Sequence, residues 1–276
     1  MHGSSQPLRG RLEFDYNHQI SSFTRATMSK HSEACCKIPP VVDEGYDPKG
    51  QFIQLDGIKT YVTGPSDASK AILAVYDIFG FYPQTFQGTD ILAWGDPEQS
   101  YQVFMPDFFD GNPAKIEWYP PVTDDQKAKI GEWFKDALWP IHRPKIPGIL
   151  QAVEKVNPNI KAWGIMGYCW GGKMASLVAG DDPGLFKAAV QTSPAQVDAA
   201  DAAKVKIPMM MLASKDESAE DVKKYGESLN VPRYVERFDD QIHGFMSARA
   251  DLRDARVKAE YERGYALALR FFHEHL

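Results

Sequence analysis

The chain has 276 residues, of which 43% are hydrophobic and 25% charged, a composition typical of a globular protein with a large core. Its 31 basic and 37 acidic residues give a formal net charge of −6, so no positive field would attract nucleic acid or an anionic membrane. Its apolar runs are far shorter than the roughly 20 residues that cross a bilayer. Three cysteines, two of them neighbours, make no disulfide framework and favour a reducing compartment such as the cytoplasm.

The first 32 residues are rich in Ser, Arg, His and Gln and have no sustained apolar period. We interpret residues 1–32 as a disordered or artificial tail. A single domain is expected over residues 45–276, and the sequence leaves its oligomeric state open.

Short apolar or alternating runs predict eight strands, the first two joined by the hairpin dipeptide Asp56-Gly57. The strands are predicted at Gln51–Leu55, Ile58–Thr63, Ala71–Tyr76, Gln102–Met105, Ala162–Met166, Ala188–Gln191, Met209–Ala213 and Arg233–Phe238. The helices are predicted at Asp124–Leu138, Lys145–Val156, Lys173–Ala179, Ala219–Leu229 and Asp251–Phe272. This alternation indicates an α/β fold, with a mostly parallel central sheet and helices on both faces. The stretch Asp107–Pro121 has no clear period and is expected to form a lid or loop.

A candidate nucleophile lies in Gly167-Tyr-Cys-Trp-Gly171, between an apolar run and a stretch that can be helical. A nucleophile elbow needs a sharp strand-to-helix turn with small residues two positions before and after the nucleophile. Gly167 and Gly171 meet that demand, so Cys169 is the predicted nucleophile, and a helix dipole there would stabilise its thiolate. The alternative is a small buried hydrophobic cysteine, which the neighbouring strand, helix and Gly172 make less favoured.

A base and an acid are expected further along the chain, each after a strand. Asp216 and then His243 occupy such positions. The order nucleophile, acid, histidine is that of α/β-hydrolases. Asp239 and Asp240 compete with Asp216 for the acid role but rank lower, because they share the loop of His243.

The strand Ala71–Tyr76 ends at Asp77-Ile-Phe-Gly80, where this fold takes one donor of its oxyanion hole. The predicted oxyanion donors are the backbone N–H groups of Ile78 and Trp170. Asp77 is either a turn or capping residue or has a role near the thiol, and the pattern leaves both open.

Five motifs together resemble the dienelactone hydrolase (carboxymethylenebutenolidase) family over roughly residues 45–276, and most of all its eukaryotic, fungal branch. They are Asp77-Ile-Phe-Gly80, Pro106-Asp-Phe-Phe109, Gly167-Tyr-Cys-Trp-Gly-Gly172, Asp216 and His243-Gly-Phe245. The resemblance implies an α/β-hydrolase fold and a triad of Cys169, His243 and Asp216 that acts on a small-molecule lactone or ester without a cofactor. A metal site is not expected either, since His273 and His275 are interpreted as solvated side chains at the end of a helix.

Two departures from the bacterial members bear on activity and substrate. Asp77 stands where those members have a glutamate, which is longer by one methylene. In those members the resemblance implies that this glutamate takes part in activation of the thiol by substrate. The two arginines that would bind the dienelactone carboxylate are unmatched, and Ser247 occupies one of their positions. Arg249 is a candidate replacement, although an arginine there is more often simply solvated.

Aromatic residues near the motifs suggest a planar or conjugated substrate. Tyr82, Tyr168 and Phe245 are candidate binding residues, together with Arg249. For any single aromatic residue, core packing is the simpler interpretation.

The expected activity is hydrolysis of a lactone or ester through a thioester on Cys169. A thioesterase or a hydrolase of C–C bonds would use the same apparatus, because each forms an oxyanion. A non-catalytic binding module on a hydrolase scaffold is the alternative from another class. Redox sensing through Cys169 is a third, and would need Cys35 or Cys36 as a resolving partner.

Overall fold

The computed structural model describes residues 41–181 and 184–276. The predicted tail, together with Cys35 and Cys36, lies outside the described residues.

The described residues form one eight-stranded sheet with the order β1-β2-β4-β3-β5-β6-β7-β8. The strands are β1 (Gln51–Leu55), β2 (Ile58–Thr63), β3 (Lys70–Val75), β4 (Gln102–Pro106), β5 (Ala162–Tyr168), β6 (Ala188–Thr192), β7 (Met209–Ser214) and β8 (Arg233–Phe238). Strand β2 pairs antiparallel with both of its neighbours, and every other pairing is parallel. All eight predicted strands are confirmed to within two residues.

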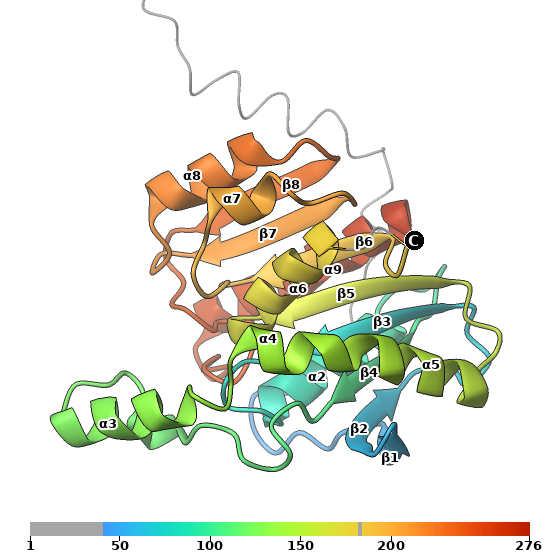
Figure 1. The fold of residues 1–276 in the computed structure, drawn as a ribbon, viewed down its shortest axis with the longest axis horizontal. Helices are drawn as coiled ribbons and strands as arrows, with labels where there is room; N and C mark the ends of the chain where they lie inside the picture. Colours follow the sequence, from blue (N-terminus) through green and yellow to red (C-terminus); the bar gives the residue numbers. More distant parts are fainter. Residues whose placement is uncertain (1–40, 182–183) are drawn as a thin grey trace, which may run out of the picture. The chain divides into compact units, whose positions relative to one another are not determined.

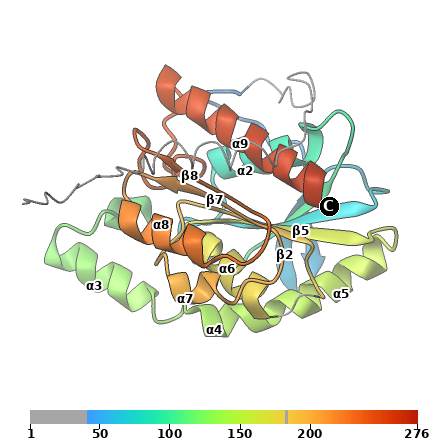
Figure 2. The same cartoon turned by 90° about the horizontal axis from the view of Figure 1, so that it is seen from above.

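Helices cover both faces of the sheet, as Figure 2 shows (α2 and α9 on one face, α5, α6 and α8 on the other). The helices are α2 (Pro83–Trp94), α3 (Asp124–Trp133), α4 (Trp139–His142), α5 (Ile146–Val156), α6 (Trp170–Asp181), α7 (Ala199–Ala202), α8 (Ala219–Ser228) and α9 (Ala255–His275). The central strands β3 and β7 are buried almost throughout, as a parallel sheet covered on both faces requires. None of the helices in the described ranges is both long and apolar enough to cross a bilayer.

Several helix boundaries differ from the prediction, and three of the differences have local reasons. Helix α3 ends at Trp133 rather than Leu138, because the next turns close with i to i−3 hydrogen bonds. Helix α6 begins at Trp170, since Gly171 and Gly172 belong to its first turn. Helix α9 begins only at Ala255, where Asp254 accepts hydrogen bonds from the first-turn N–H groups and caps the helix.

Helix α2 escaped prediction because most of its length is buried and it has no polar face to reveal a helical period. The stretch Asp107–Pro121 is irregular, as expected, with one 3₁₀ turn, η2 (Ile116–Trp118). Figure 1 shows α3 standing away from the sheet at the end of this irregular stretch.

The order of the strands marks a place for a site. From β3 the chain continues to β4 on one side, while β5 lies on the other side. In open α/β sheets, ligands bind beyond the carboxyl ends of the strands at such a reversal. The turns after β3 and β5, which carry Asp77 and Cys169, meet there.

Two glycines allow that meeting by close contact of main chains. A Cβ on Gly171 would lie 1.9 Å from the carbonyl oxygen of Val75 in β3, and one on Gly167 would lie 1.9 Å from the carbonyl oxygen of Gly171. Side chains cannot be accommodated at such distances, so the glycines of the motif are demanded by packing between β3, β5 and α6.

We expect Gly171→Ala to lower the free energy of unfolding by about 3 kcal/mol or to prevent folding, because the atoms it meets are main chain and cannot move aside. The control is Gly131→Ala in α3, where a Cβ meets nothing within 4 Å and should stabilise the helix by up to about 1 kcal/mol. Urea unfolding of both variants measures this. Equal stability of the two variants would contradict the packing argument.

Candidate active site

Cys169 occupies a strained turn between β5 and α6. Its φ is +51°, in the left-handed region, which a residue other than glycine adopts only when its surroundings hold it there. Here they do, because its N–H donates to Thr192 (3.0 Å) and its carbonyl oxygen accepts from the N–H groups of Lys173 (3.1 Å) and Ala195 (2.9 Å). This is the geometry of a nucleophile elbow.

His243 lies in the loop after β8, and an acidic side chain holds its ring. The ring Nδ1 is 2.6 Å from Oε1 of Glu217. The other carboxylate oxygen of Glu217 accepts a hydrogen bond from the N–H of Ser214 at the end of β7. Since the Glu217 side chain is only 5% exposed, its carboxylate is fixed on both oxygens in a site largely closed to water.

The structure therefore brings Glu217, not the predicted Asp216, to the histidine ring. Asp216 is exposed, and its Oδ2 accepts from the main-chain N–H of His243 at 2.8 Å. In the turn after β7 the two neighbouring side chains diverge, and the one that points inward is Glu217. The adjacent acids Asp216-Glu217 were the signal in the sequence, but their direction depends on the turn.

The charge on His243 follows from its neighbours. Burial lowers the pKa of the His243 imidazole, but the negative charges of Cys169 and Glu217 and their hydrogen bonds to the ring outweigh burial and raise this pKa from 6.5 to about 11. The imidazolium is thus the form favoured at neutral pH, between a sulfur on one side and a carboxylate on the other.

The two predicted oxyanion donors lie beside the sulfur. Ile78 and Trp170 both line, with Cys169 and His243, a cavity of about 390 Å³. Trp170 is the first residue of α6, whose first N–H groups have no partner within the helix. Among the hydrogen bonds of the described residues, none uses the N–H of Ile78 or Trp170. Both donors are therefore available to a ligand oxygen.

Asp77 is buried between two segments of the site. Its Oδ1 accepts from the N–H of Phe79 (2.9 Å), and its Oδ2 accepts from the N–H of Ala248 (3.2 Å). Burial raises the pKa of the Asp77 carboxyl, and hydrogen bonds from Ser247, Phe79 and Ala248 partly offset this. The contacts tie the turn after β3 to the loop that carries His243.

The structure does not bring the four candidate substrate-binding residues to the cavity that contains Cys169. Tyr168 and Phe245 are fully buried: the Tyr168 hydroxyl is 3.0 Å from that of Tyr265, and the Phe245 ring packs on Phe238. Both are therefore core residues and do not line the cavity.

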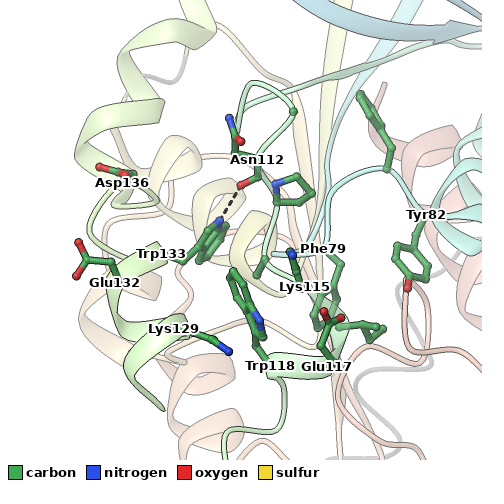
Figure 3. Close-up of a pocket in the computed structure, with 15 residues that line it drawn as sticks. Phe79, Tyr82, Asn112, Lys115, Glu117, Trp118, Lys129, Glu132, Trp133 and Asp136 are labelled. Atoms are coloured by element: carbon green, nitrogen blue, oxygen red, sulfur yellow. Dashed lines mark hydrogen bonds between the residues drawn. The ribbon is translucent and has the colours of Figure 1, made fainter. Parts of the chain in front are cut away.

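Tyr82 and Arg249 also lie elsewhere. Tyr82 lines a separate hollow of about 780 Å³ beside α3, drawn in Figure 3. Arg249 donates to the carbonyl oxygen of His243 (2.9 Å) and lies over the Tyr119 ring, 5.3 Å from its centre. It therefore fixes the histidine loop.

The hollow in Figure 3 has several aromatic residues in its lining. Its lining includes Phe79, Phe81, Trp118 and Trp133, and Trp133 Nε1 donates to the Asn112 carbonyl oxygen at 2.8 Å. It shares no lining residue with the cavity at Cys169.

The cavity at Cys169 has an aromatic wall that the sequence did not indicate. Tyr119, Phe134 and Trp139 form it. They come from the irregular stretch before α3, the end of α3 and the start of α4, and only tertiary structure places these three segments over the elbow.

Comparison with known proteins assigns the chain to a family. The model of the dienelactone hydrolase family matches residues 58–276. The chain belongs to this family. A fungal relative, an uncharacterized AIM2 family protein of Schizosaccharomyces pombe, is 33% identical over 83% of this chain and 93% of its own length. The carboxymethylenebutenolidase homolog of Rattus norvegicus is 28% identical over 81% of this chain and 90% of its own.

The solved structures agree with the fold. The dienelactone hydrolase of Anabaena variabilis superposes with a TM-score of 0.58, covers 82% of this chain and 97% of its own, and is 13% identical. As a member of the dienelactone hydrolase family with an α/β-hydrolase fold, the protein is a hydrolase that acts on ester or lactone bonds.

We expect His243 to be a cation at about pH 8, where a histidine of ordinary pKa is neutral. NMR titration of the protein labelled with ¹⁵N-histidine measures this. Glu217→Gln should lower the pKa of His243, because it removes a negative charge at 2.6 Å.

His142 is the internal control, because burial lowers its pKa and it should be neutral at the same pH. An ordinary titration of His243 near its reference value would contradict the expectation.

Proposed function

We propose that the protein hydrolyses a small lactone or ester through a thioester on Cys169, with His243 as the proton carrier and Glu217 as the acid that orients it. The observation that carries the proposal is that the ends of three strands meet at one cavity. Cys169 follows β5 in a strained turn, and the ring of His243, after β8, is fixed on the buried carboxylate of Glu217, after β7. This is the arrangement that nucleophilic catalysis needs.

In the first half of the reaction, the thiolate of Cys169 attacks the carbonyl carbon, and a C–S bond forms. The N–H groups of Ile78 and Trp170 stabilise the oxyanion. The C–O bond then breaks, and the leaving oxygen takes a proton from the His243 imidazolium. In a lactone, this oxygen stays attached to the acyl group.

In the second half, the neutral imidazole removes a proton from water, whose oxygen attacks the thioester. The C–S bond breaks, the product leaves as a carboxylic acid, and the thiolate and imidazolium are restored. Throughout, Glu217 keeps Nδ1 protonated and stabilises the imidazolium, so that Nε2 faces the reacting atoms.

The role of Asp77 in activating the thiol stays a prediction. Its contacts with Phe79 and Ala248 support a positioning role, in which it holds the oxyanion turn and the histidine loop at a fixed separation.

Cys169→Ala should lower kcat/KM for p-nitrophenyl acetate by about 10³-fold or more, because it removes the attacking atom. The melting temperature should change little, since the side chain borders a cavity. A spectrophotometric assay with a thermal scan checks both. Turnover above one tenth of wild type would rule out the thiol nucleophile.

The neighbouring acids make a matched pair that identifies the orienting acid. Glu217→Gln should lower kcat by about 10²-fold or more, because an amide cannot stabilise the imidazolium. Asp216→Asn should cost less than about tenfold, since the amide oxygen of the new side chain can still accept from the His243 N–H. Steady-state kinetics of both variants measure these two losses. If Asp216 were the orienting acid, Asp216→Asn would show the larger loss of kcat.

A further inference from the structure

Apart from Cys169 and His243, the charged side chains that line the cavity at Cys169 are all acidic. Asp216, Glu217 and Asp221 line it, and no lysine or arginine is among its lining residues in the described part of the chain. Asp221 lies in the first turn of α8 and is exposed. Glu217 pairs with the ring of His243, which leaves the exposed carboxylates of Asp216 and Asp221 at the cavity.

Two arginines near this cavity already have hydrogen-bond or ion-pair partners within the protein. Arg249 contacts the His243 carbonyl oxygen and the Tyr119 ring. The guanidinium of Arg237 donates to the main-chain oxygens of Lys215 (2.6 Å) and Glu217 (3.1 Å) and pairs with Asp239. Neither guanidinium is among the groups that line the cavity, so neither presents its charge directly to a ligand there.

Much of the remaining lining of the cavity is apolar. Tyr119, Phe134 and Trp139 supply aromatic surface, and Pro194 and Val197 complete it. A cavity of about 390 Å³ is within the range that takes a small ring ligand. A neutral acyl compound would therefore meet aromatic surface at no electrostatic cost, whereas an anion would be repelled by the acidic side chains.

We propose that the cavity selects uncharged lactones and esters and rejects substrates that carry a carboxylate. The proposal deepens the proposed function and rests on it. It departs from what the family name suggests, because a dienelactone with a carboxymethylene group is an anion at neutral pH. The hydrolytic step is the same, but neither the acyl group nor the leaving group of the substrate carries a charge.

The test uses two esters that differ by one charge, 4-acetoxybenzamide and 4-acetoxybenzoate. Their kcat/KM values are divided by their rates of hydroxide hydrolysis to remove intrinsic reactivity. We expect the amide to be preferred at least tenfold, with a smaller preference at high salt, since ions screen exposed charges.

Asp221→Lys reverses one charge at the cavity without touching the proposed reacting groups. It should raise the ratio of kcat/KM for the benzoate to kcat/KM for the benzamide at least threefold. The matched control is Asp125→Lys in the first turn of α3, which makes the same change in net charge away from the cavity lining and should leave both substrates unchanged.

A second readout needs no hydrolysis. Alkylation of Cys169 by iodoacetamide and iodoacetate is followed by mass spectrometry, relative to glutathione, and the neutral reagent should be favoured at least tenfold. If neither ester is cleaved but this preference holds, the proposed function fails and the charge selection stands.

Equal normalised rates for the two esters, with no effect of Asp221→Lys, would overturn the selection while leaving the hydrolase intact. A loss confined to the benzoate in Arg249→Gln would also overturn it, because Arg249 would then be binding the carboxylate.

Discussion

The contact between Gly171 and the main chain at Val75 is the constraint on which the site depends. A Cβ there would overlap the carbonyl oxygen of β3, so the start of α6 can lie on that strand only if this residue has no side chain. The contact holds the turn that carries Cys169 against the turn that carries Ile78. In this way Ile78, the proposed oxyanion donor after β3, and the sulfur of Cys169 after β5 come to line the same cavity.

The histidine side of the cavity is assembled by main-chain contacts of a different kind. Three charged side chains bind backbone groups in or beside the loop of His243: Asp216, Arg249 and Asp77. A fourth, Glu217, binds the ring itself. Three charged side chains thus fix the loop, which leaves the fourth to set the orientation and charge of the imidazole. A buried carboxylate with both oxygens occupied suits that task, because it cannot rotate to another partner.

The sequence predicts the sheet well, because buried parallel strands read as short apolar runs between turns, and all eight are found. It also predicts the turn that carries Cys169, because the packing of the backbone there requires the flanking glycines. The acid at the ring is not predictable in this way, because Asp216 and Glu217 are neighbours and only the turn decides which one points inward. Nor are Tyr119, Phe134 and Trp139, whose approach to Cys169 depends on an irregular stretch with no period.

The cavity therefore has two sources within the chain. The groups proposed to react stand on the ends of β3, β5, β7 and the loop after β8, whereas the aromatic wall comes from the single segment between β4 and β5. Changes in that segment reshape what the cavity admits, and they also reach the proposed reacting groups, because Trp139 Nε1 donates to the carbonyl oxygen of Trp170 (2.9 Å) and Arg249, which holds the loop of His243, lies over the Tyr119 ring. The size and shape of the space above Cys169 therefore depend on one stretch of chain that lies outside the sheet.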